Sequence, residues 1–79
     1  MNPEILSKRL CQCRKEAGLT QAQVAIYSDI TEKAYQNYEA LRREPKLEIL
    51  VRIADTLDVS LDYLVGRSDE KQYYKQEKA

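Results

Sequence analysis

Apolar residues recur every three or four positions along most of this chain, in segments separated by residues that start or stop helices. The first segment follows Asn2-Pro3-Glu4, where Asn2 can cap a helix and Pro3 suits its first position. It ends before Gly18, which tolerates the left-handed backbone of a helix end. Its apolar positions are Leu6, Leu10, Cys13 and Ala17. The pattern predicts a helix over residues 3–17.

Two shorter segments follow, and each begins after a threonine that can cap it. Thr20 precedes the first, and Gln23 three residues later completes the pattern of a capping box. Thr31 precedes the second segment. We predict helices over residues 21–28 and 32–40, joined by a tight turn. The inward residues of these two helices are Val24, Ala25, Ala34, Tyr35 and Tyr38.

The second half of the chain contains one strongly amphipathic segment and one short one. A polar loop that ends in a proline leads to a helix predicted over residues 46–57. Its apolar stripe at the helical period consists of Leu47, Leu50, Val51, Ala54 and Leu57. Asp58 closes this helix. Ser60 caps a short helix over residues 61–65, which Gly66 ends.

Together these segments predict an all-α fold, with one compact five-helix domain over residues 1–66. Two glycines and two prolines in 79 residues leave few compulsory breaks, and good helix formers are abundant. Residues 67–79 are polar and lack an apolar stripe. We interpret them as a partly ordered C-terminal extension, in which a helix could begin after Ser68.

The composition argues against several classes of function. No apolar run approaches the about 18 residues that a membrane span needs, so we expect a cytoplasmic protein without membrane contact. The chain has no His, no Gly-rich phosphate loop and no nucleophile–base pair, so we expect no enzymatic activity, cofactor or metal. Cys11 and Cys13 point in different directions on a helix and make a poor metal site. We interpret Cys13 as a small buried apolar group.

Several short motifs occur in a fixed order between residues 5 and 66. They are Leu19-Thr20-Gln21, Val24-Ala25, Ile30-Thr31, Tyr38-Glu39, Pro45, Leu47-Glu48-Ile49-Leu50, Ala54, Leu57 and Val59-Ser60-Leu61-Asp62-Tyr63-Leu64. In this order they resemble the Cro-like, XRE-type family of helix-turn-helix repressors. The resemblance implies a phage-repressor-like fold and a transcriptional regulator, in particular a repressor. Such a protein reads the major groove of double-stranded DNA with the helix over residues 32–40, and a homodimer would contact two half-sites.

The resemblance also implies roles for individual residues. Positions that face base edges or adjacent phosphates are held by Thr31, Glu32, Lys33 and Asn37, with Gln36 beside them. Phosphate-contacting positions are held by Gln21, at the start of its helix, and by Arg42, Arg43 and Lys46 in the following loop. The chemistry agrees with these roles. Lys33 can donate to guanine, Asn37 can bond adenine at two atoms, and Glu32 can accept from cytosine.

These positions also have plainer interpretations. Thr31 can be a helix cap and nothing more, and the polar residues of the same helix can be an ordinary solvated face. The net charge is zero, with 13 basic and 13 acidic residues, which argues mildly against nucleic-acid binding. Residues 31–46, however, carry four basic groups (Lys33, Arg42, Arg43, Lys46) and three acidic ones (Glu32, Glu39, Glu44). The balance becomes four to two if Glu39 is neutralised.

Glu39 lies among core residues of its helix and therefore needs a partner if it is buried. The family pattern pairs it with a basic residue of the first helix, and Arg14 holds the matching position. We expect this ion pair to be structural.

Three positions depart from the family pattern. Asp29 stands where a turn glycine is usual, and it tolerates that backbone. Leu41 stands where a glycine usually follows the recognition helix. Leucine is costly in a left-handed conformation, so we expect the loop to take a different path. Ser28 replaces a large apolar residue, so the core beneath the second helix is expected to be thin, or to be completed by Ile26 or Tyr27.

One alternative belongs to a different functional class. A chain of this fold could serve as a protein-interaction or dimerisation module, such as an antitoxin-like component of a regulator pair. In either case the last helix and the extension are the expected material for self-association. The apolar groups expected to become buried there are Leu64, Val65, Tyr73 and Tyr74.

Overall fold

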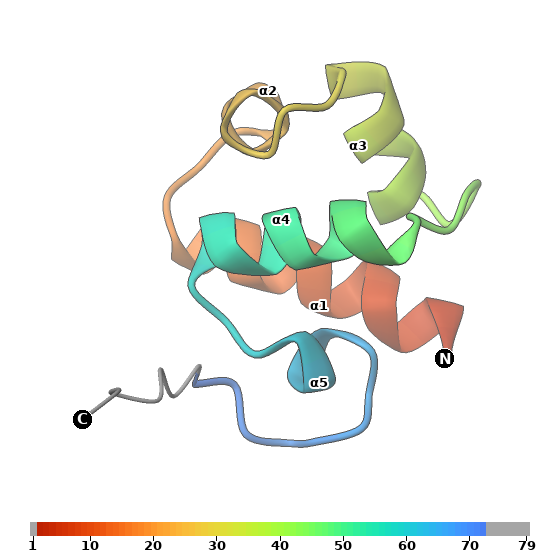
Figure 1. Ribbon diagram of the computed structural model, residues 1–79, viewed down its shortest axis with the longest axis vertical. Helices are drawn as coiled ribbons and strands as arrows, with labels where there is room; N and C mark the ends of the chain where they lie inside the picture. Colours follow the sequence, from red (N-terminus) through yellow and green to blue (C-terminus); the bar gives the residue numbers. More distant parts are fainter. Residues whose placement is uncertain (1, 73–79) are drawn as a thin grey trace.

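A computed structural model describes residues 2–72, and over this range the chain forms five helices (Figure 1). They are α1 (Pro3–Glu16), α2 (Gln21–Tyr27), α3 (Glu32–Glu39), α4 (Leu47–Leu57) and α5 (Leu61–Leu64). The all-α prediction is confirmed, and each helix boundary lies within one residue of its expected place. Within residues 2–72 the only β pairing is an isolated antiparallel bridge between Val59 and Gln72. No helix in this range is long and apolar enough to cross a membrane.

The helix starts follow from the side chains that precede them. Asn2, Thr31 and Ser60 each accept hydrogen bonds from backbone N–H groups of the first helical turn. Thr20 and Gln23 form the expected capping box, with the Thr20 N–H donating to Gln23 Oε1 at 2.8 Å. These bonds satisfy donors that a helix leaves unpaired at its N-terminus. α4 is the exception, because Lys46 before it provides no side-chain cap.

All five helix ends share one geometry. After each helix a residue adopts a positive φ, and the next N–H group reaches back to a carbonyl inside the last turn, as in the Schellman motif. The left-handed residues are Gly18, Asp29, Leu41, Asp58 and Gly66. The chain thus reverses sharply after every helix, which keeps the connections short.

Leu41 contradicts the expectation of a different loop path. It has a φ of 64°, so a leucine occupies the left-handed position that glycine usually holds. The N–H groups of Leu41 and Arg42 donate to the carbonyls of Tyr38 (3.4 Å) and Asn37 (2.9 Å). These hydrogen bonds hold the conformation in spite of its steric cost.

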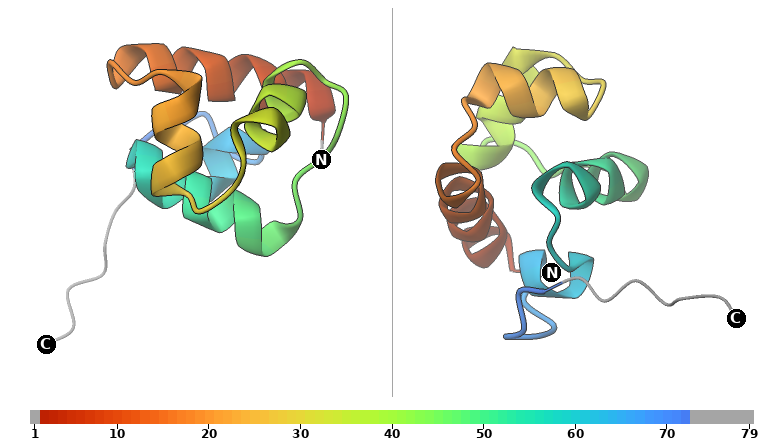
Figure 2. Two further views of the ribbon diagram at one scale, coloured as in Figure 1. Left: turned by 90° about the horizontal axis from the view of Figure 1, so that it is seen from above. Right: turned by 90° about the vertical axis from the view of Figure 1, so that its left-hand side faces the viewer.

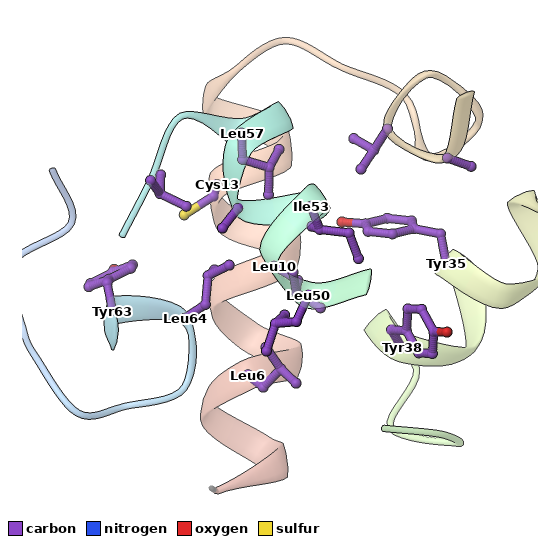
Figure 3. Close-up of a cluster of buried hydrophobic side chains, with 14 residues drawn as sticks. Leu6, Leu10, Cys13, Tyr35, Tyr38, Leu50, Ile53, Leu57, Tyr63 and Leu64 are labelled. Carbon is purple, nitrogen blue, oxygen red and sulfur yellow. The ribbon is translucent and has the colours of Figure 1, made fainter. Parts of the chain in front are cut away.

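α1 and α4 form the middle of the molecule, with α2 and α3 at one end and α5 at the other (Figures 1 and 2). Side chains from all five helices meet in a single core, drawn in Figure 3. Tyr35 and Tyr38 belong to this core as expected, and the Tyr35 side chain extends from α3 toward Ile53 of α4. Cys13 is also buried, as expected, and burial raises the pKa of its thiol.

Three expectations about the core are wrong. Ala17, expected among the inner apolar positions of the first helix, is exposed and follows the end of α1. Leu47 and Val51 were placed in the apolar stripe of α4, but they are 69% and 39% exposed, and Ile53 is buried in the core. Ile26 and Tyr27 do not compensate for Ser28, because both side chains point to solvent. Ser28 is fully buried, and its hydroxyl pairs with that of Thr56 at 3.0 Å. A hydrogen bond between α2 and α4 therefore occupies the place of an apolar contact.

The predicted ion pair between α1 and α3 is confirmed. Arg14 Nε donates to Glu39 Oε2 at 2.7 Å, and Arg14 Nη2 donates to Glu39 Oε1 at 3.3 Å. The two side chains are only 14% and 7% exposed. A second bond joins the same helices, since the Ser7 hydroxyl donates to the backbone carbonyl of Glu39. α3 is thus fixed to α1 at its C-terminal end.

Residues 67–72 pack against the five-helix domain. The Arg9 guanidinium donates to the carbonyls of Tyr63 and Ser68, pairs with Asp69 and lies 4.0 Å from the centre of the Tyr63 ring. Lys71 forms an ion pair with Glu16. The helix considered after Ser68 is absent over 69–72, where the chain bends at Asp69 and the Lys71 carbonyl accepts from the Ser60 N–H at 2.9 Å.

The expected dimerisation residues need correction as well. Leu64 is fully buried in the core and is not available to a second chain, and Val65 is half-buried against that core. Tyr73 and Tyr74 lie outside the described residues.

The left-handed Leu41 predicts a stabilising substitution. Leu41→Gly removes the steric cost of this backbone and sacrifices little burial, because Leu41 is 48% exposed. We expect a gain of about 0.5–1 kcal/mol in the free energy of unfolding, after allowance for the larger entropy of glycine in the unfolded chain. Ala40→Gly is the matched control, because Ala40 has a φ of −88° and should lose about 0.5–1 kcal/mol. Urea unfolding measures both, and a loss of stability in Leu41→Gly would show that the left-handed leucine carries no such cost.

The Arg14–Glu39 pair predicts a large and pH-dependent loss of stability on Glu39→Gln. Breaking a buried pair costs about 3–5 kcal/mol, which lowers the melting temperature of a small domain by more than about 10 °C. Burial by itself raises the pKa of Glu39, but the hydrogen bonds from Arg14 and Gln21 and the nearby Tyr35 hydroxyl outweigh it, so the pKa is lowered.

The sign of the pH effect follows from that lowered pKa. The contribution of Glu39 is complete above its unfolded pKa of about 4.3 and is lost as the pH falls through the folded pKa. Thermal melts of the two proteins should therefore differ most at about pH 7 and converge below about pH 4. A constant difference across this range would show that the carboxylate charge is not the stabilising group.

Candidate nucleic-acid interface

α2, the turn after it and α3 form a helix-turn-helix unit at one end of the molecule (Figure 1). The turn is set by Asp29, whose φ of 58° reverses the chain, and by Ile30, whose N–H donates to the Ala25 carbonyl at 3.0 Å. Thr31 then caps α3 by accepting from the Ala34 N–H at 3.1 Å. Asp29 also lies 3.6 Å from Arg52 of α4, an exposed ion pair that contributes little stability.

The five base-reading candidates lie on the outer side of α3. Thr31, Glu32 and Lys33 are exposed at the start of the helix, and Gln36 and Asn37 are half-buried one turn later. Gln36 Nε2 donates to Glu32 Oε2 at 3.2 Å, so these two side chains are already joined. The opposite face of α3 is buried through Tyr35 and Tyr38. The buried face anchors α3 in the core, and the polar side chains on its other face point outward.

The α3–α4 loop presents the basic candidates. Arg42, Arg43 and Lys46 are exposed, and Pro45 between them is buried. The N–H groups of Arg42 and Arg43 both donate to the carbonyl of Asn37, at 2.9 Å and 3.4 Å. The loop is thus attached to the same turn of α3 that carries a base-reading candidate. This attachment fixes the spacing between the two sets of candidates.

Ion pairing leaves the basic groups of this surface available. Within residues 2–72 the ion pairs join Arg9 to Asp69, Arg14 to Glu39, Arg52 to Asp29 and Lys71 to Glu16. In that part of the chain, none of the four cations of residues 31–46 has an acidic partner. Glu39 is neutralised by Arg14, as expected, so the exposed balance of residues 31–46 is four basic groups to two acidic ones. The surface has a modest positive charge.

Gln21 differs from the other candidates because its side chain is bound inside the protein. It is half-buried at the start of α2, and its Nε2 donates to Glu39 Oε1 at 3.1 Å. Arg14 Nη1 donates to the carbonyl of Leu19 at 3.0 Å, which ties the preceding linker to the same ion pair. The sequence predicted the Arg14–Glu39 pair and, separately, a phosphate contact for Gln21, and the structure joins all three side chains in one network.

The Tyr35 hydroxyl borders this network. It is buried and has no hydrogen-bond partner among the described residues. Burial raises the pKa of Tyr35, and the Glu39 carboxylate raises it further. Glu39 therefore lies close enough to act on the hydroxyl electrostatically, without being placed for a good hydrogen bond. Tyr35 remains protonated and serves as part of the core.

Sequence reasoning missed three sets of long-range contacts in the fold, two of which hold this unit in place. They are the Ser28–Thr56 hydrogen bond, the Ser7 bond to the Glu39 backbone and the Arg9 contacts with residues 63–69. Each joins residues at least 28 positions apart, and a hydroxyl or guanidinium carries no sequence signal that names its distant partner. The half-buried Cys11 Sγ lies 3.9 Å from Arg14 Nη2.

Comparison with known proteins agrees with this geometry. A helix-turn-helix family model matches residues 12–64. The chain is 44% identical over 75 residues to YqaE, an uncharacterised HTH-type transcriptional regulator of Bacillus subtilis, with 94% of this chain and 65% of the relative covered. It is 42% identical over 69 residues to RstR, the transcriptional repressor of the cryptic phage CTXphi in Vibrio cholerae, with 85% and 62% covered.

A third relative is the HTH-type transcriptional regulator ImmR of Bacillus subtilis, 36% identical over 64 residues, with 81% of this chain and 50% of the relative covered. The chain thus spans about half to two thirds of the length of these relatives. No solved structure matches it significantly. The matched residues 12–64 contain the whole unit of α2, turn and α3, and they make up more than half of the chain. The chain belongs to the helix-turn-helix family.

Proposed function

We propose that this protein is a transcriptional regulator, and specifically a repressor, that binds double-stranded DNA with α3 in the major groove. One observation carries the proposal: the polar outer side of α3 is continuous, through the Asn37 carbonyl, with a loop of exposed cations. The printed names of the relatives support regulation, and that of RstR supports repression.

The chemistry of the α3 side chains fits base reading. Lys33 and Asn37 are four residues apart and therefore share a face of the helix. Lys33 can donate to the O6 and N7 atoms of guanine, and Asn37 can bond adenine at N6 and N7. Glu32 can accept from the amino group of cytosine. Thr31 and Gln36 lie beside this face and can contact either bases or phosphates.

Phosphate contacts are assigned to the loop and to the start of α2. Arg42, Arg43 and Lys46 can neutralise phosphates beside the groove, and Gln21 can donate a neutral hydrogen bond. Four cations allow only a few such contacts, so binding to random DNA should be weak at physiological salt. A homodimer on two half-sites would double the specific contacts without adding charge to each chain.

The polar character of this surface favours DNA over the protein-interaction alternative. The cores of protein interfaces are depleted of charged residues, whereas DNA interfaces are polar and positively charged. The exposed residues between 31 and 46 include four cations, and Leu41 is the one large apolar side chain among them.

Substitutions on α3 and on the loop should affect DNA binding in different ways. Asn37→Ala should weaken binding to the preferred site by about 1–3 kcal/mol and leave random DNA nearly unaffected, because only a base edge carries sequence information. Arg42→Ala or Arg43→Ala should weaken binding to all sequences and reduce the log–log salt slope by about one. Fluorescence anisotropy across a salt series measures both effects.

Arg67→Ala is the matched control for lost charge, because Arg67 follows α5 at the opposite end of the molecule (Figure 1). It should leave both the affinity and the salt slope unchanged. If Arg67→Ala and Arg42→Ala reduce binding equally, the contacts are not confined to the proposed surface.

A dimer makes a separate prediction about the DNA sequence. Selection from random duplexes should return a palindrome whose half-sites lie about 34 Å apart or a multiple of that distance, because the symmetry of the site mirrors that of the protein. Sedimentation of the complex should then show two chains on each duplex. A single unrepeated site occupied by one chain would exclude the homodimer and leave DNA binding in place.

A further inference from the structure

The Gln21 side chain is held by the same carboxylate that pairs with Arg14. Glu39 Oε2 accepts from Arg14 Nε at 2.7 Å, while Glu39 Oε1 accepts from Gln21 Nε2 at 3.1 Å and from Arg14 Nη2 at 3.3 Å. Glu39 is the last residue of α3, and Gln21 is the first residue of α2. The contact therefore joins the beginning of one helix of the unit to the end of the other.

The ionised carboxylate determines which way the amide of Gln21 faces. A carboxylate only accepts hydrogen bonds, so the nitrogen of the amide and not its oxygen must lie on the Glu39 side. One N–H of this nitrogen is used by Glu39, and the second N–H points away from it. Gln21 is only half-buried, so part of the residue lies at the surface of the protein.

The ion pair also removes an electrostatic obstacle. An unpaired carboxylate next to a phosphate-contacting group would repel the phosphate. Here the charge of Glu39 is matched by that of Arg14, and its side chain is only 7% exposed. The arrangement can orient a donor toward an anion without opposing the approach of that anion.

We propose that Glu39 is a positioning residue for DNA binding, which orients the Gln21 amide so that its second N–H donates to a DNA phosphate. The inference rests on the proposed function, because it assumes that the start of α2 meets the DNA backbone. It gives the ion pair a second role beyond the stability of the fold. The buried pair prepares the side chain of Gln21 before DNA arrives, so less freedom is lost on binding.

A double-mutant cycle on DNA affinity tests the coupling. Glu39→Gln places an amide beside Gln21, which brings a competing donor and a weaker acceptor, so the Gln21 side chain is no longer held in one orientation. We expect Glu39→Gln and Gln21→Ala each to lower the affinity for the preferred site by roughly twofold to tenfold. The double variant should bind no more weakly than Gln21→Ala alone. All affinities are measured at a temperature where circular dichroism shows each variant to be folded.

Two control substitutions separate positioning from loss of structure. Ser7→Ala removes the other bond between α1 and the Glu39 backbone, so it weakens the same contact but leaves the carboxylate and Gln21 in place. It should lower the melting temperature without lowering the affinity of the folded protein. Arg42 does not contact Glu39, so the losses from Arg42→Ala and Glu39→Gln should multiply.

The outcomes distinguish this inference from the function on which it rests. If Glu39→Gln reduces affinity by the same factor in the wild-type protein and in the Gln21→Ala variant, or if Ser7→Ala reduces it as much, Glu39 acts only through the fold and the inference is wrong. If the wild-type protein binds no selected duplex above its affinity for random DNA, the proposed function fails and this inference fails with it.

Side-chain amide spectra of the wild-type protein provide a test that needs no variant at position 39. One Gln21 amide proton should exchange slowly and show a cross-peak to the Glu39 side chain, and the other should shift when the preferred duplex is added. Gln23 is the internal control, because it bonds the Thr20 N–H through its oxygen and not its nitrogen. If both Gln21 protons exchange as fast as those of Gln23, or neither shifts on DNA, the inference is overturned.

Discussion

The buried carboxylate of Glu39 is the constraint on which the arrangement of this domain depends. A charge at this depth is tolerated only when it is paired and hydrogen-bonded, and Arg14 and Gln21 meet that requirement from two other helices. The three helices cannot shift relative to one another without exposing the Glu39 carboxylate or leaving it without a partner. The bond from Ser7 to the Glu39 backbone adds a second attachment at the same point. The orientation of α3, and with it the outward direction of the DNA-reading candidates, follows from this requirement.

The helix ends supply the second constraint, because they set how the chain passes from one helix to the next. Asp29 and Leu41 take the left-handed positions on either side of α3 without the help of glycine. The left-handed backbone of Leu41 has a steric cost, and it occurs where the basic loop begins. The hydrogen bonds to the Asn37 carbonyl account for this, because they keep the loop against the helix and not free in solvent. The same hydrogen bonds to the Asn37 carbonyl thus explain both the strained backbone of Leu41 and the position of Arg42.

Local signals made much of the fold predictable, and distant contacts account for what was missed. Caps such as Thr20 act on residues only a few positions away, so the helix starts could be read directly from the sequence. The face of α4 could not, because Leu47, Val51 and Ile53 are all apolar and only the packing of other helices decides which of them is buried. The Ser28–Thr56 bond depends on two helices crossing at one place, which no spacing rule reveals. At the candidate site, the sequence was enough to predict that polar and basic residues are exposed on α3 and its loop. It was not enough to predict the hydrogen bond from Gln21 to Glu39.

The distribution of ion pairs resolves the conflict between a neutral chain and the proposed DNA-binding surface. Four acidic residues of the described chain are paired with Arg9, Arg14, Arg52 and Lys71. The cations of these pairs lie on α1, α4 and the segment after α5, whereas the cations of α3 and its loop have no acidic partner among residues 2–72. A net charge of zero is therefore compatible with a local excess of positive charge where α3 and its loop face outward. Because that excess is small, non-specific attraction to phosphate is limited, and the energy of binding must come largely from oriented hydrogen bonds. On the proposed function, a domain of this kind depends on the rigidity of α3 more than a strongly basic one does, and the buried Arg14–Glu39 pair provides that rigidity.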